Sequence, residues 1–130
     1  TMFDGLAVAA KRFGSRPLAD SLAPAIALAS DGLILDPMTA RTFELLWPIL
    51  RRDPSCLAEI ADGLSTDRPP RPGERLRNPK LAATLEAFAE AEAMPPTVAD
   101  GLLEHFGSER GGRIARVDLQ PRVEVRVTGQ

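Results

Sequence analysis

The chain has 130 residues, of which 44% are apolar and 26% charged, and this composition is typical of one globular domain or a piece of a larger one. The net charge of −2 argues against a general nucleic-acid binder, which usually carries a basic excess. The single cysteine, Cys56, and the single histidine, His105, exclude an intrachain disulfide and any cysteine- or histidine-rich metal site.

The first part of the chain has the pattern of two helices. Residues 2–13 are helical in spacing and are followed by Gly14, and residues 18–30 are helical and are followed by Gly32. Pro24 lies inside the second segment, so we expect a break or kink there. Residues 1–10 have no basic start before an apolar stretch, so they are not expected to be an intact signal peptide.

Three Asx-Pro pairs predict the next three helix starts. The side-chain oxygen of each Asp or Asn suits the N-cap, and the missing N–H of proline costs nothing at the first helical position. Apolar residues at helical spacing follow each pair, and Trp47, in the first of these stripes, is expected in the core. Pro48 is expected to kink or end that helix. The pairs are Asp36-Pro37, Asp53-Pro54 and Asn78-Pro79.

The second half of the chain adds one helix, one connection and one strand. A helix is expected from about Thr97, with Asp100 completing a weak capping box and Gly107 as its stop. Residues 65–77 are rich in proline and arginine and are expected to be an extended surface connection. Residues 122–128 alternate between apolar and polar and predict an edge strand, which needs a sheet from sequence outside this chain. The apolar runs are too short to span a bilayer.

Candidate chemistry is sparse in this sequence. His105 near a helix end and Cys56 near a helix start are each better explained by a structural role than by catalysis. The arginines of the connection could grip an anion, but a solvated loop is the better interpretation because no aromatic residue is interleaved. No catalytic, cofactor-binding or metal-binding residue is therefore assigned, no cofactor is indicated, and the compartment stays unknown. The arginines are Arg68, Arg71, Arg75 and Arg77.

Four motifs in order resemble the large subunit of the gamma-glutamyltransferase family. They are Arg12-Phe13-Gly14, the stretch LAPAIALASDGLIL at 22–35, the run from Pro72 through Arg77-Asn78-Pro79 to Leu85, and Gly111-Gly112 followed by Asp118-Leu119. The resemblance covers residues 5–128. The chain departs from the family pattern at 96–99, near Glu92 where the family has a glycine, and at Arg122 where it often has a tyrosine.

The resemblance implies a self-cleaving precursor with an αββα N-terminal nucleophile hydrolase fold. In that family a new N-terminal threonine of the small subunit acts as nucleophile, with its own amine as base. That threonine lies beyond the part matched here, so no catalytic residue is transferred, and Thr1 is not that nucleophile.

The sequence therefore predicts a mainly α segment of five to six short helices with one C-terminal strand, forming a helical lobe over residues 1–130. The parent protein is expected to transfer or hydrolyse a γ-glutamyl group from glutathione or a related amide. The expected partner is the rest of the same precursor, with its small subunit and central sheet, and neither nucleic acid nor a membrane. The alternative is a stand-alone, non-enzymatic helical interaction module. A weaker third hypothesis has the arginines of the connection binding a polyanion.

Overall fold

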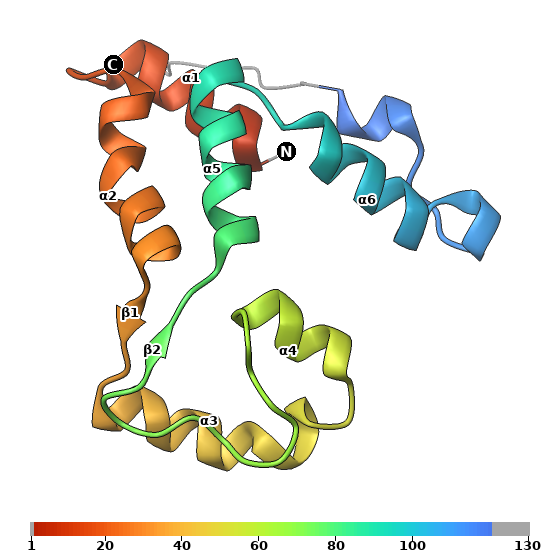
Figure 1. Cartoon of the computed structure of the whole chain (residues 1–130). Coiled ribbons are helices and arrows are strands. Elements are labelled where there is room, and N and C mark those ends of the chain that lie inside the picture. The colour runs from red at the N-terminus through yellow and green to blue at the C-terminus, as the bar shows by residue number, and fades with distance from the viewer. Residues whose placement is uncertain (1, 121–130) are drawn as a thin grey trace, which may run out of the picture. The chain divides into compact units, whose positions relative to one another are not determined.

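The structure is a computed structural model, and it describes residues 2–120. The described part is mainly helical, with six α-helices, a two-stranded sheet and two short 3-10 helices (Figure 1), so the expected fold class is confirmed at this level. No helix among these residues is long and apolar enough to cross a membrane. In chain order the elements are α1 (Met2–Phe13), α2 (Leu18–Asp31), β1 (Leu33–Ile34), α3 (Pro37–Leu50), α4 (Pro54–Ile60), β2 (Arg75–Leu76), α5 (Pro79–Ala91), α6 (Pro96–Phe106), η1 (Ser108–Arg110) and η2 (Arg116–Leu119).

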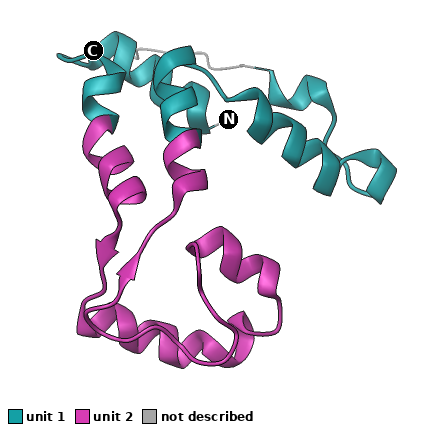
Figure 2. Cartoon of the chain, viewed as in Figure 1, with its two compact units in different colours: residues 1–22, 84–130 teal, residues 23–83 magenta. Residues whose placement is uncertain are grey.

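The chain divides into two compact units. Unit 1 comprises residues 1–22 and 84–130, and unit 2 comprises residues 23–83 (Figure 2). Helices α2 and α5 each begin in one unit and end in the other, so the chain passes between the units only inside helices.

Unit 1 has a small core around Phe88. This side chain is 1% exposed and lies in a cluster with the buried Ala7 and Leu18. Phe3 packs edge-on against it, with ring centroids 4.9 Å apart at 73°. This geometry is favourable because the positive edge of one ring meets the negative face of the other.

The three Asx-Pro pairs begin helices as predicted. The Asp36 carboxylate accepts hydrogen bonds from the N–H groups of Met38 (2.8 Å) and Thr39 (3.0 Å) at the start of α3. Asp53 accepts from the Ser55 N–H (2.9 Å) at the start of α4. These bonds satisfy donors that have no partner inside a helix. The Thr39 and Ser55 hydroxyls also donate to the two carboxylates, and these side-chain bonds, followed by the backbone ones, lower the pKa of both carboxyls.

The prolines interrupt the helices less than expected. Helix α2 runs through Pro24 without a break, and α3 continues past Pro48 to Leu50. A proline removes one backbone hydrogen bond, and the neighbouring bonds of these 14-residue helices remain. Trp47 is 5% exposed, which confirms its place in the core.

The expected cap of the last long helix is wrong. Helix α6 begins at Pro96, its N-cap Pro95 makes no side-chain bond, and Thr97 therefore lies inside the helix. The Asp100 carboxylate instead pairs with the Arg116 guanidinium at 2.9 Å. The helix does end before Gly107, as predicted.

A small antiparallel sheet was missed from the sequence. Leu33 of β1 pairs with Leu76 of β2, so the predicted connection over 65–77 ends in a strand. Gly32 precedes β1 with a φ of +93°, and a Cβ there would lie 2.7 Å from the side chains of Arg75 and Arg77. A strand of two residues is too short to show the alternation of apolar and polar residues by which strands are predicted from sequence. The predicted strand over 122–128 lies outside the described residues.

Asn78 joins three helices of unit 2. Its Oδ1 accepts from the Leu81 N–H (2.9 Å), which caps α5. Its Nδ2 donates to the last carbonyls of α4, those of Glu59 (2.8 Å) and Ile60 (3.1 Å). Its backbone N–H donates to the Ala29 carbonyl of α2 at 2.8 Å. One side chain therefore satisfies both an orphan N–H and orphan carbonyls of helix ends.

Glu92 has an unusual backbone conformation. It follows the last residue of α5 with a φ of +48°, and it is the one non-glycine residue with positive φ in the described range. Its N–H donates to the Phe88 carbonyl at 2.9 Å, as in a helix C-terminal turn. A positive φ favours glycine, which is the residue that the family resemblance implies near this position.

We expect Asn78→Ala to lower the free energy of unfolding by about 2 kcal/mol, because it removes an N-cap and two further hydrogen bonds. Asn78→Asp keeps the cap but places a carboxylate oxygen against two carbonyls, so it should also destabilise. Urea unfolding measures both. Asp53→Asn is the matched control and should change little, since Asp53 only accepts hydrogen bonds from its helix start. Equal stability of Asn78→Asp and the unmodified protein would show that the α4 contacts contribute nothing.

We expect Glu92→Gly to raise the free energy of unfolding by about 0.5–1 kcal/mol, because glycine adopts positive φ without steric cost. Glu90→Gly, two residues earlier inside α5, is the control and should lower it by a similar amount. Thermal and urea unfolding of the two variants measure both changes. A change of the same sign in Glu92→Gly and Glu90→Gly would refute the prediction.

Candidate functional site

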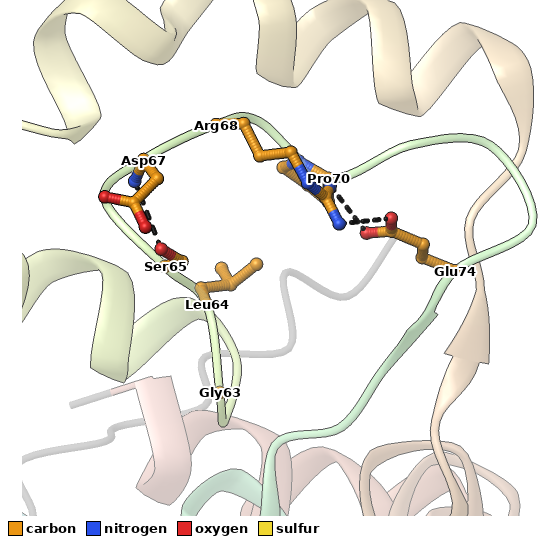
Figure 3. A pocket seen from close by; sticks show the side chains of 7 residues that line it. All are labelled: Gly63, Leu64, Ser65, Asp67, Arg68, Pro70 and Glu74. Atoms are coloured by element: carbon orange, nitrogen blue, oxygen red, sulfur yellow. Dashed lines mark hydrogen bonds and ion pairs between the residues drawn. The ribbon is translucent and has the colours of Figure 1, made fainter.

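The segment 63–74 of unit 2 surrounds a hollow of ≈ 410 Å³. Figure 3 shows that side chains from both ends of this segment face the hollow. Backbone hydrogen bonds hold the end of this segment to Leu35, because the Leu35 N–H donates to the Glu74 carbonyl and the Gly73 N–H donates to the Leu35 carbonyl, both at 2.8 Å. The lining residues are Gly63, Leu64, Ser65, Asp67, Arg68, Pro70 and Glu74.

Two of the charged groups of this hollow, Arg68 and Glu74, pair with each other. Arg68 makes two parallel contacts to the Glu74 carboxylate, at 2.9 and 3.3 Å (Figure 3). Hydrogen bonding from Arg68 is the main reason that the pKa of Glu74 lies below its usual value. The Ser65 hydroxyl accepts the Asp67 N–H at 3.1 Å, which makes it part of a turn. The Arg68 guanidinium, the Glu74 carboxylate and the Ser65 hydroxyl therefore stabilise the loop itself.

Two arginines just beyond this segment, Arg75 and Arg77, bind the end of helix α2. Arg75 donates to the carbonyls of Asp31 and Gly32, both at 3.1 Å, and Arg77 donates to that of Asp31 at 3.2 Å. Cations at a helix C-terminus satisfy orphan carbonyls and oppose the negative end of the helix dipole. Arg75 therefore uses one guanidinium nitrogen to bind the end of α2, and polyanion binding by the arginines of the connection stays a prediction.

The single histidine and the single cysteine do not line this hollow. His105 is in the last turn of α6, and its Nδ1 lies 2.9 Å from the Gly101 carbonyl one turn earlier. Cys56 is exposed in the first turn of α4. Within residues 2–120, no cluster of three or more His, Cys, Asp or Glu side chains is arranged to hold a metal ion.

Trp47 is a buried residue with a feature that the sequence did not signal. Its indole N–H has no hydrogen-bond partner among the described residues. The residue borders a second hollow, which Arg51 and Arg52 also line. Burial of an N–H without a hydrogen-bond partner costs free energy. The start of α3, by contrast, has its N–H groups bonded to Asp36.

Comparison with known proteins decides the family. The model of the gamma-glutamyltranspeptidase family matches residues 1–126. The chain belongs to this family. It is 34% identical over 125 residues to the acylase ACY 1 proenzyme of Pseudomonas sp. strain V22, and 35% identical over 127 residues to that of strain SE83. Each match covers 94% of this chain but 22% of the relative, so the chain spans about a fifth of the length of these relatives.

Two solved structures each contain a part that is similar to the fold of this chain. The TM-score is 0.72 to the Helicobacter pylori gamma-glutamyltranspeptidase, at 22% identity over 88% of this chain and 33% of that one. It is 0.71 to the cephalosporin acylase of Bacillus halodurans, at 28% identity over 90% of this chain and 23% of that one. In both, the fold described here is part of a much longer chain.

Two residues of the motifs that resemble the gamma-glutamyltransferase family make close contacts within this chain. Asn78 of the Arg77-Asn78-Pro79 motif joins three helices, as described above. Gly112 of the double glycine packs against the Phe106 carbonyl so closely that a Cβ has no room. Its N–H donates to the Gly107 carbonyl at 3.0 Å. Local contacts in this part of the fold thus account for these two motif residues, through side-chain hydrogen bonds for Asn78 and close backbone packing for Gly112.

We expect the Glu74 carboxyl to titrate below its ordinary value of 4.5. Because the folded state favours the ionised form, the Arg68–Glu74 pair stabilises the loop above this value, and the stabilisation is lost as the pH falls through the lowered pKa. An NMR titration of the Glu74 carboxyl measures this. Arg68→Ala should raise the pKa toward 4.5, and the control Arg71→Ala should raise it less, since Arg71 contributes less. An unchanged pKa in Arg68→Ala would contradict the pairing.

Proposed function

We propose that this chain is the helical part of the large subunit of an amide-cleaving N-terminal nucleophile hydrolase. The whole protein would transfer or hydrolyse an acyl group held in an amide, with a γ-glutamyl group from glutathione or a related amide as the first candidate. The observation that carries the proposal is the family match over residues 1–126. The two Pseudomonas relatives are named as proenzymes, which supports a partnership with the rest of one precursor.

The proposed role of residues 2–120 is structural. The polar side chains that catalysis could have used are engaged locally: the Ser65 hydroxyl in a turn, the Arg68 guanidinium with Glu74, and the His105 ring with the Gly101 carbonyl. Each contact stabilises a loop or a helix end. The catalytic nucleophile would come from the small subunit, as the family resemblance implies.

A side-chain amide of a cephalosporin is a second candidate substrate. The relatives with 34% and 35% identity are named as acylases, and the structural neighbour with 28% identity is a cephalosporin acylase. Both candidates need the same chemistry, in which a hydroxyl attacks the amide carbonyl, a covalent acyl-enzyme forms and the amine leaves. They differ in the acyl group that the protein recognises.

The experiment is expression of the natural polypeptide that contains this sequence, followed by mass spectrometry of its subunits and two amide assays. We expect cleavage into two subunits and release of amine from a γ-glutamyl anilide or from a cephalosporin side-chain amide. The preferred substrate separates transpeptidase from acylase. A protein that stays uncleaved and hydrolyses neither amide would refute the proposal and favour the interaction module.

We expect Ser65→Ala, Cys56→Ala and His105→Ala to keep kcat within about threefold in that polypeptide, because a structural contact does not act on the reacting atoms. Steady-state kinetics on the preferred amide measures this. The control is alanine substitution of the first residue of the small subunit, found by mass spectrometry, which should abolish activity. A loss of about 10²-fold or more from one of the three variants would place that residue in the reaction.

A further inference from the structure

Helix α3 of unit 2 carries apolar side chains on two opposite faces. Its inner face includes Ala40 and Trp47, which are buried, and Phe43, which is half-buried. Its other face carries Met38, Leu45 and Ile49, which are exposed by 77%, 65% and 66%. We name these last three residues the outer stripe of α3.

Helix geometry separates the two faces. The members of the outer stripe are spaced i, i+7 and i+11, so they line one side of the helix. At about 100° per residue, Leu45 lies roughly 160° around the helix axis from Phe43. A helix at the surface of a complete globular protein usually has one apolar face, and a helix that is apolar on opposite sides is usually buried.

A second apolar surface lies on the inner side of α3. Thr39 and Phe43 of that side, with Leu33 of β1, line a hollow of ≈ 380 Å³ that is bordered mainly by apolar side chains. Leu33 is 50% exposed. Unit 2 therefore presents apolar surface on both sides of one helix. A single symmetric contact with a second copy would cover one side, whereas a long polypeptide can cover both.

We infer that the outer stripe of α3 packs against an apolar face of the remaining part of its own longer polypeptide. This rests on the proposed function, in which the chain is one part of a hydrolase precursor. The chain matches 22% of each Pseudomonas proenzyme and 23% of the Bacillus halodurans acylase, so more than three quarters of each relative lies outside the match. The three side chains of the outer stripe are uncharged, so the surface that covers them is expected to be apolar. The neighbouring Arg41 and Glu44 on the same helix pair with each other.

Oxidation of Met38 by hydrogen peroxide in the natural full-length polypeptide tests this inference. Peptide mass spectrometry gives the oxidation rate of Met38 under native conditions and in urea. We expect most of the oxidation to be lost under native conditions, because a covered thioether reacts slowly. Residues 2–120 alone leave this side chain 77% exposed, so without a covering surface Met38 would oxidise rapidly under native conditions.

Other outcomes of the oxidation experiment overturn the inference. If Met38 oxidises as fast as in urea while the polypeptide is processed and cleaves an amide, the outer stripe faces solvent and the proposed function stands. Protection that disappears on dilution, together with dissociation of a dimer in analytical ultracentrifugation, would assign the stripe to a second copy. If neither processing nor amide cleavage occurs, the proposed function fails, and rapid oxidation of Met38 would refute the inference as well.

A pair of variants at Leu45 gives an independent measurement on the same polypeptide. Leu45→Glu should lower the Tm by roughly 5 °C or more, because it places a charge in an apolar contact. Leu45→Met is the matched control and should change the Tm little, since it keeps the apolar area. Equal Tm values for Leu45→Glu and the unmodified protein would overturn the inference. If Leu45→Glu does not fold, the oxidation of Met38 still decides the question.

Discussion

The fold of unit 2 depends on the hydrogen bonds of Asn78. The start of α5 and the end of α4 leave backbone groups without helical partners, and the Asn78 amide supplies one acceptor and two donations to them. Its backbone N–H also bonds α2. An aspartate would lack the donor, and a lysine would lack the acceptor. The Asn-Pro pair therefore sets both where α5 begins and which helices it meets.

The arginines of the neighbouring loop extend this arrangement. Arg75 and Arg77 bind the carbonyls at the end of α2, and Arg68 holds Glu74 on the other side of the loop. These three arginines, whose charge would suit an anion, thus bind the C-terminal end of α2 and the carboxylate of Glu74. This assignment agrees with a structural role for the segment in the proposed hydrolase.

Several residues of the motifs that indicate the gamma-glutamyltranspeptidase family make packing or hydrogen-bond contacts in this chain. Asn78 bridges helices, Gly32 admits two arginine stems, and Gly112 lies against a carbonyl. The exposed outer stripe of α3 and the apolar hollow behind it are surfaces that a larger fold would bury. In the proposed hydrolase the chain would supply a scaffold, and the chemistry would belong to the rest of the polypeptide.

The sequence by itself determined the helices, because helix starts and apolar stripes are local signals. Asp36, Asp53 and Asn78 cap the helices that their Asx-Pro pairs predict, and four ordered motifs were enough to indicate the family. The two-stranded sheet and the partners of the arginines were decided only by the tertiary structure. Leu33 and Leu76 are 43 positions apart, and the contact of Arg75 with Asp31 spans 44, so no local pattern encodes them. Such contacts exist only once the helices have brought distant backbone groups together.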